Sequence, residues 1–191
     1  MRSDAPKGIT PSVILINPKY SHNVGAALRA CSCFDIAQLW WTGDRVTIDP
    51  VKGESLPREE RMKGYRDVQM CPHNHPFDQF ARTAVPVAVE VRERSECLTL
   101  FEHPDDAAYV FGPEDGSIPK TLLRHCHRFV HIPSRHCLNL STAVAVVLAH
   151  RRMWRQLNGK EPLVPLSEML REQRGAGRET PTLDSMGWDG K

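Results

Sequence analysis

The feature that most constrains the fold is a strand-and-loop unit that occurs twice between Tyr109 and His150. The apolar run 109–111 breaks at Gly112-Pro113 into a loop with two acids, and the run 129–132 stops at Pro133 before a long apolar helix. Short apolar runs that end at glycine or proline are typical of strands. Ligands bind at such strand ends in α/β proteins. We therefore expect the two loops to line one pocket.

Similar short apolar runs alternate with helical spacing along most of the chain. The sequence predicts strands at 13–16, 37–41, 68–70 and 85–91, and an extended segment at 46–48. It predicts helices at 23–34, 58–65, 76–82 and from Leu138 to about 157, with one or two further turns at 165–171. Asn23 is placed at the N-cap of its helix. The alternation favours an α/β fold, a mostly parallel sheet covered by helices on both faces.

The chain of 191 residues is long enough for one domain with a core. We expect a flexible N-terminal tail at 1–11, the domain at 12–158 and a C-terminal tail at 159–191. The tail is expected to be partly disordered, because from Gly175 onward it mixes glycine with charged and polar residues.

The positions of the cysteines and histidines indicate the cellular compartment and whether the chain binds a metal. Several of the six cysteines lie in apolar segments and no signal peptide precedes them, so a reducing cytoplasm is predicted. The histidine-rich segments 71–75 and 125–127 lack paired zinc-ligand spacing, and we expect no metal. No apolar run reaches the roughly 20 residues that cross a bilayer, so we expect no membrane association.

Three ordered motifs resemble those of the SPOUT-class, TrmH-like (SpoU) RNA 2′-O-ribose methyltransferases. The first is an Asn-x-Gly helix start followed by an arginine, here Asn23 to Arg29. The second is FGPEDGSIP at 111–119, and the third is Ile132-Pro133 with CLNLSTAVAVVLAH at 137–150. The resemblance covers residues 12 to 155. It implies a C-terminal trefoil knot, S-adenosylmethionine as methyl donor, RNA as substrate and a homodimer.

The resemblance also implies the catalytic residues, namely Arg29, Asn23, Glu114 and Asn139. Arg29 lies off the apolar stripe of its helix, and without the resemblance the sequence favours a surface ion-pair residue at this position. In the family this arginine acts at the ribose hydroxyl, often across a dimer interface. Asn23 is compatible with a plain cap, and Glu114 with a helix or loop cap.

The donor-binding residues implied by the resemblance are Glu90, Gly112, Ile132, Cys137, Leu138 and Ser141. Glu90 has an alternative as an exposed acid at a strand end. Cys137 replaces the serine of many relatives, and a thiol is a weaker hydrogen-bond partner than a hydroxyl. A role that needs a hydroxyl at this position is therefore in doubt.

The predicted activity is S-adenosylmethionine-dependent methylation of a ribose 2′-hydroxyl, with tRNA favoured over rRNA. The formal charge is only +2, so RNA contact would depend on a local patch such as Arg58, Arg61, Lys63 and Arg66, which is equally a solvated helix face. One alternative is a catalytically inactive RNA-binding module of the same fold. Another is an α/β enzyme for a different nucleotide, but the chain lacks GxGxxG and GxxxxGK[ST].

Overall fold

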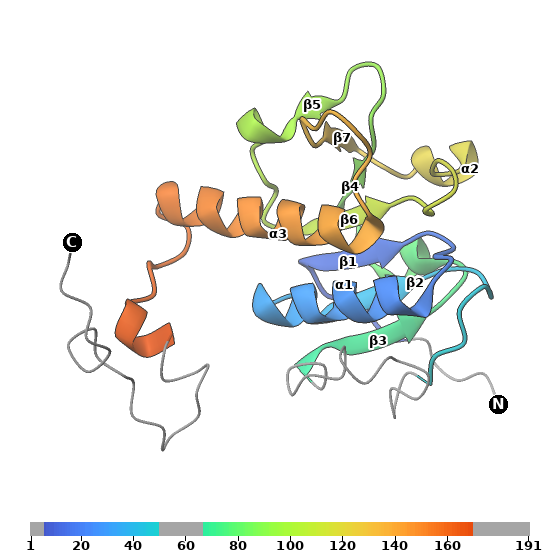
Figure 1. Cartoon of the computed structure of the whole chain (residues 1–191), viewed down its shortest axis with the longest axis horizontal. Helices are drawn as coiled ribbons and strands as arrows, with labels where there is room; N and C mark the ends of the chain where they lie inside the picture. Colours follow the sequence, from blue (N-terminus) through green and yellow to red (C-terminus); the bar gives the residue numbers. More distant parts are fainter. Residues whose placement is uncertain (1–5, 50–66, 170–191) are drawn as a thin grey trace, which may run out of the picture. The chain divides into compact units, whose positions relative to one another are not determined.

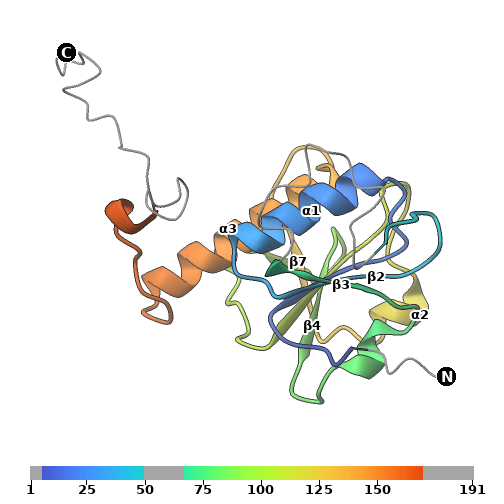
Figure 2. The ribbon, with the colours of Figure 1, turned by 90° about the horizontal axis from the view of Figure 1, so that it is seen from below.

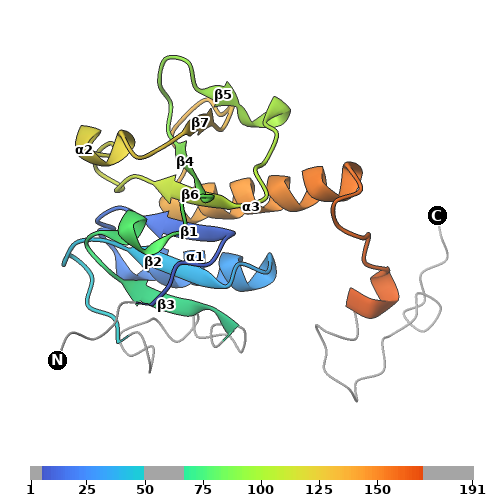
Figure 3. The ribbon, with the colours of Figure 1, turned by 180° about the vertical axis from the view of Figure 1, so that it is seen from behind.

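The computed structural model describes residues 6–49 and 67–169. The chain divides into two compact units, residues 1–155 and 156–191. The first unit contains a seven-stranded sheet in the order β3-β2-β1-β6-β4-β7-β5, in which every neighbouring pair is parallel. Figure 1 shows this sheet with its helices. Figure 3 shows from behind that β3 and β5 are the two edge strands.

The strands are β1 (Ser12–Leu15), β2 (Gln38–Trp41), β3 (Gln69–Pro72), β4 (Val85–Val89), β5 (Glu96–Cys97), β6 (Ala107–Phe111) and β7 (Arg128–His131). The α-helices are α1 (Ser21–Cys33), α2 (Lys120–Leu123) and α3 (Leu140–Leu157). Two short 3-10 turns are η3 (Pro76–Gln79) and η4 (Leu98–Leu100).

The two central strands are buried along their whole length. All residues of β1 and β6 are buried, as expected for strands covered on both faces of a parallel sheet. Phe111 pairs with Leu15 of β1 and with Val89 of β4, so the carboxyl ends of these strands are level. The loops that follow β1, β4 and β6 therefore start from the same edge.

The two faces of the sheet are covered unequally. Helices α1 and α3 pack on one face through residues such as Val24, Leu28, Val144 and Leu148. The other face carries a smaller apolar cluster around Trp40, against which η3 and α2 place partly buried side chains. Figure 2 shows α1 and α3 together on one side of the sheet and α2 on the other. This confirms a parallel sheet covered on both faces, while the trefoil knot stays a prediction.

Residues 46–48, predicted as an extended segment, belong to no strand, and Val46 and Ile48 are buried in the core. Other sequence expectations are wrong. The helix predicted at 76–82 is only the η3 turn. Neither α2 nor β5 was predicted. The helix predicted at 58–65 and the basic segment around it lie outside the described residues.

The starts of the two long helices also differ from the prediction. Helix α1 begins at Ser21 with Tyr20 as its N-cap, so Asn23 is not the cap; its side chain is buried and bonded elsewhere. Helix α3 begins at Leu140 instead of Leu138, because the Asn139 side chain accepts the amide of Ser141 at 2.9 Å.

The second unit is described only to residue 169. Its residues 166–169 are helical, within the predicted helical turns at 165–171. The predicted disorder from Gly175 onward lies outside the described residues.

Candidate active site

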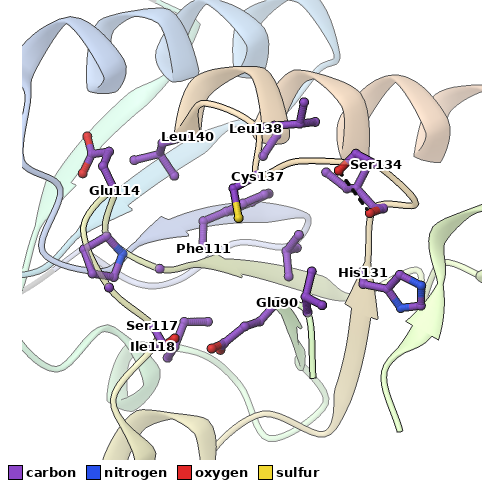
Figure 4. Close-up of a pocket in the computed structure, with 17 residues that line it drawn as sticks. Glu90, Phe111, Glu114, Ser117, Ile118, His131, Ser134, Cys137, Leu138 and Leu140 are labelled. Atoms are coloured by element: carbon purple, nitrogen blue, oxygen red, sulfur yellow. Dashed lines mark hydrogen bonds between the residues drawn. The ribbon is translucent and has the colours of Figure 1, made fainter. Parts of the chain in front are cut away.

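A cavity of about 300 Å³ lies at the carboxyl ends of β4, β6 and β7. It is formed by the residues after those strands and by the start of α3 (Figure 4), and its apolar walls include Val89, Phe111, Ile118, Ile132, Leu138 and Leu140. The two loops that the sequence placed in one pocket therefore do meet. A concave, mostly apolar space with few polar groups is typical of a small-molecule site.

Glu90 supplies a carboxylate to this cavity. Figure 4 shows the Glu90 side chain extending toward the loop that carries Ser117 and Ile118. Its Oε2 atom is buried and has no hydrogen-bond partner among the described residues. A buried acceptor without a donor is costly, by roughly 1–3 kcal/mol. The cavity is therefore suited to a ligand that donates a hydrogen bond to Glu90.

Gly112 lets the second motif fold tightly over the cavity. A Cβ atom at this position would lie 3.3 Å from both the backbone nitrogen and Cγ1 of Ile118. The glycine therefore makes room for Ile118 of its own loop. Ile118 is buried and lines the cavity, and sequence reasoning did not single it out. The repeated Ile-Pro pair, at 118 and at 132, was the signal that could have found it.

A chain of hydrogen bonds joins the three motifs. Asn23 Nδ2 donates to Glu114 Oε1 at 2.7 Å, and Asn139 Nδ2 donates to Asn23 Oδ1 at 3.0 Å. The chain continues at both ends, because Glu114 Oε2 accepts the Lys19 amide at 2.7 Å and Asn139 Oδ1 accepts the Ser141 hydroxyl at 2.7 Å. We call these five residues the motif network. Only Glu114 among them also lines the cavity.

The motif network holds Glu114 in its ionised form. Burial by itself raises the pKa of this carboxyl, but the hydrogen bonds from Asn23 and the Lys19 amide outweigh burial and lower the pKa below its usual value. An ionised Glu114 is an acceptor at both oxygens. The loop after β6 is thus tied to the loop after β1 and to α1 at neutral pH.

The other predicted site residues separate into two groups. Gly112, Ile132, Cys137 and Leu138 line the cavity, and Figure 4 shows the Cys137 sulfur directed into it. Ser141 does not line the cavity, since its hydroxyl belongs to the motif network.

Arg29 is the predicted residue that the structure brings neither to the cavity nor into the motif network. Its side chain is exposed on α1, and it makes no hydrogen bond or ion pair with the described part of the chain. Asn23, six residues earlier on the same helix, is buried and bonded. The helix therefore presents one predicted catalytic residue inward and the other to solvent.

An ion-pair cluster that the sequence did not reveal borders the second motif. Arg45 binds both carboxylate oxygens of Asp115, at 2.7 and 3.0 Å, and the Lys19 ammonium lies 3.4 Å from the same carboxylate. The hydrogen bond from Arg45 is the main cause that lowers the pKa of Asp115 to about 2. Arg45 follows β2, so its proximity to Asp115 depends on strand order and leaves no local pattern.

The described residues contain no disulfide and no candidate metal cluster. The six cysteines are all free thiols. Within 6–49 and 67–169, no three histidine, cysteine or acidic side chains converge as potential metal ligands. None of the described helices has the length and apolar character needed to cross a membrane.

Comparison with curated proteins finds two relatives named TrmJ. The chain is 28% identical over 170 residues to the tRNA (cytidine/uridine/adenosine-2′-O-)-methyltransferase TrmJ of Pseudomonas aeruginosa, covering 78% of this chain and 63% of the relative. It is 28% identical over 156 residues to the tRNA (cytidine-2′-O-)-methyltransferase TrmJ of Methanocaldococcus jannaschii, covering 72% and 65%. The chain thus spans less than two thirds of the length of either relative.

Solved structures share the fold. The TrmH/SpoU tRNA modifying enzyme of A. aeolicus matches with a TM-score of 0.66 and 17% identity, over 88% of this chain and 87% of that one. The SpoU methyltransferase AviRb of Streptomyces viridochromogenes, in complex with the cofactor AdoMet, matches with a TM-score of 0.64 and 16% identity, over 82% and 63%. The model of the SpoU rRNA Methylase family matches residues 11–149, so this chain belongs to that family.

Proposed function

We propose that this chain is an S-adenosylmethionine-dependent methyltransferase that modifies a ribose 2′-hydroxyl of RNA, with tRNA favoured over rRNA. The observation that carries the proposal is the motif network, which fixes three distant segments around the Glu90 cavity. Membership of the SpoU family supports the reaction. The names of both TrmJ relatives specify 2′-O-methylation of tRNA, which supports the substrate.

The cavity residues fit the methyl donor. Glu90 Oε2, which has no partner among the described residues, can accept a hydrogen bond from a ribose hydroxyl of the donor, and the apolar Ile132 and Leu138 can pack on its adenine. S-adenosylmethionine supplies a sulfonium methyl group when it is bound. The cavity volume of about 300 Å³ is at the lower end of the range for small-molecule sites. The AviRb structure with AdoMet supports this choice of cofactor.

Arg29 is proposed to act on the ribose. A 2′-hydroxyl is a weak acid, so its attack is faster where a fixed positive charge stabilises the developing alkoxide. A guanidinium group stays charged at neutral pH and suits this role. Because Arg29 is exposed and does not line its own cavity, we place it in the active site of a second copy of the chain. The enzyme is then a homodimer with shared sites.

Donor binding and methyl transfer test the function directly. Calorimetry is expected to detect S-adenosylmethionine binding to the wild type, with no binding of NAD.

Single-turnover methylation of an unmodified tRNA transcript is expected to fall on the order of 100-fold in Arg29→Ala, with donor affinity within a few-fold. Arg29→Lys is expected not to restore full turnover, because it lacks the guanidinium fork. The exposed Arg82→Ala is the matched control. A wild type that binds RNA but transfers no methyl group would instead indicate an inactive RNA-binding module.

Mixing two inactive variants tests the shared site. Arg29→Ala and Glu90→Ala damage the two halves of a composite site, so each homodimer is expected to be inactive. In a randomly mixed 1:1 population, one site of each heterodimer is intact, and about a quarter of wild-type activity is expected to return. No recovery, together with heterodimers detected by native mass spectrometry, would place Arg29 in the site of its own chain.

A further inference from the structure

Two exposed rings stand at the start of α1. The rings of Tyr20 and His22 stack with centroids 5.3 Å apart and planes 20° from parallel. Tyr20 is 44% exposed and His22 is also exposed. The Lys19 ammonium lies 5.4 Å from the centre of the Tyr20 ring. The Lys19 ammonium group and the two stacked rings thus form one small surface patch.

The backbone beneath these rings is firmly held next to the cavity loop. The Lys19 amide donates to Glu114, which lines the cavity, and the Tyr20 carbonyl accepts the Asn23 amide at 3.1 Å. Asn17 is tied in turn to Thr42 by a bond of 3.0 Å from its amide to the hydroxyl. The stacked pair therefore has a defined position beside the proposed active site.

Packing and capping do not account for the rings. Tyr20 is the N-cap residue of α1, but its side chain makes no capping hydrogen bond. Neither ring belongs to the two apolar clusters of the core. Exposed, preorganised aromatic rings at a ligand site are suited to stacking against another flat group.

We propose that the Tyr20–His22 pair is a stacking site for an unpaired base of the RNA substrate. The proposal rests on the proposed function and names a contact that sets substrate choice. Nucleobases stack on aromatic side chains whatever their sequence, and one such contact changes affinity roughly 5- to 150-fold. Unpaired bases in loops are the parts of an RNA that proteins reach in this way. The pair would thus favour a target in a loop over one in a duplex.

Charge near the pair supports base stacking in preference to phosphate binding. Lys19 and Arg45 are balanced by Glu114 and Asp115, which they contact or adjoin. The patch accordingly has little net charge with which to attract a phosphate. The exposed faces of the two rings, in contrast, are available for stacking.

The helix geometry connects the pair to Arg29. His22 and Arg29 are seven positions apart, so they lie on the same face of α1, about 10 Å from each other along its axis. Both are exposed. A base on the pair and a ribose in the partner's site, which Arg29 is proposed to complete, would then follow one continuous path along this face. The alternative occupant of the ring surface itself is a second copy of the chain, but cores of protein interfaces are depleted in charged residues, and the rings adjoin Lys19 and Asp115.

The test compares ring removal with ring retention. Fluorescence anisotropy with an unmodified tRNA transcript is expected to show that Tyr20→Ala weakens binding roughly tenfold, whereas Tyr20→Phe stays near the wild type. The wild type is expected to bind a single-stranded loop more tightly than a blunt RNA duplex. This difference in affinity is expected to be smaller in Tyr20→Ala. Leu100→Ala removes an 82% exposed apolar side chain far along the chain and is the matched control.

Three further results would overturn the proposal. Unchanged RNA affinity in Tyr20→Ala would show that the rings touch no base. A smaller mass of this variant in light scattering would assign the rings to contact between copies. A large loss of S-adenosylmethionine affinity would make Tyr20 part of the donor cavity. Absence of methyl transfer by the wild type would refute the proposed function, and the RNA affinities would still decide the stacking site.

Discussion

Two hydrogen-bonded chains connect β6 to its neighbours, and they differ in what surrounds them. The motif network borders the cavity at the carboxyl end of β6. A second chain, which we call the histidine chain, links Tyr109 of β6 to His103 and His150, with distances of 2.6 Å from the Tyr109 hydroxyl to His103 Nδ1 and 2.8 Å from His103 Nε2 to His150 Nδ1. His103 and Tyr109 are completely buried or nearly so.

The difference lies in closure and in charge. Aromatic rings of Phe101 and Trp154 pack around His103, whereas the motif network includes Asn139, which is exposed. The motif network contains an ionised carboxylate, while burial keeps the histidine chain neutral. Similar bonds therefore serve different ends. The motif network is open and contains a charge, which suits its proposed role of positioning groups for a ligand, whereas the mostly buried histidine chain links β6 to α3.

The largest effect is expected from Asn23→Asp, which breaks the motif network. Asn23 Nδ2 lies 2.7 Å from Glu114 Oε1 in the wild type. A carboxylate oxygen in its place would bring two negative charges together, and they would repel each other. Unfolding free energy is expected to fall on the order of 3 kcal/mol. Turnover is expected to fall about 100-fold through misplacement of the loops. Thermal unfolding and single-turnover methylation measure the two losses.

A matched variant sharpens this result. Asn74→Asp keeps the acceptor that binds the Gly43 amide and adds only an exposed charge, so it is expected to behave as the wild type. Lowering the pH should partly restore the stability of Asn23→Asp, because one proton can be shared by the two carboxyls. Equal stability of both variants at pH 8 would contradict the importance of the motif network.

A smaller effect is expected from His103→Phe in the histidine chain. The change removes the two hydrogen bonds that His103 makes, to the Tyr109 hydroxyl and to His150 Nδ1, and should lower the unfolding free energy by about 2 kcal/mol. Methyl transfer per folded molecule should stay within a few-fold of the wild type, because His103 lies outside the cavity. A loss of turnover in fully folded protein would show that the two chains are coupled.

The pH dependence of stability gives the smallest and most specific effect. Burial, and then the neighbouring His150 and arginine charges, lower the pKa of His103 from 6.5 to about 3. The unfolded chain takes up a proton near pH 6.5 and the folded protein does not, so this contribution is complete above pH 6.5 and is lost as the pH falls toward 3. Its slope is at most about 1.4 kcal/mol per pH unit. Urea unfolding between pH 5 and 7.5 should show a weaker slope in His103→Phe than in the wild type.

The sequence predicted elements well where each strand or helix has its own local pattern. The apolar runs of β1, β6 and β7 and the helical spacing of α3 were identified within a few residues. Strand β5 has only two residues and α2 only four, too few for any periodicity to show. The start of α1 was misplaced because Tyr20 is not a typical capping residue, whereas Asn23 is.

The sequence predicted which residues belong to the candidate site but not how they are arranged. The motifs brought Asn23, Glu114 and Asn139 into the candidate set, yet Asn23 and Glu114 are 91 positions apart, and no local rule states that they bond. The Arg45–Asp115 pair and the histidine chain lacked even a motif. The Arg45–Asp115 contact follows from the order of strands in the sheet, and the His103–His150 contact from the packing of α3, and a single sequence determines neither.

The position of β6 between β1 and β4 has a consequence for how the chain acquires its shape. Ser12 pairs with Ala108, so β1 cannot pair with β6 until the whole segment between these two residues has left the ribosome. Pairings so distant in sequence slow folding, because a long loop must close before any contact is gained. During synthesis, β1 and β2 can pair early, but one edge of β1 stays open until β6 inserts. That open apolar edge is where a nascent chain of this family would be most prone to aggregate and most dependent on chaperones.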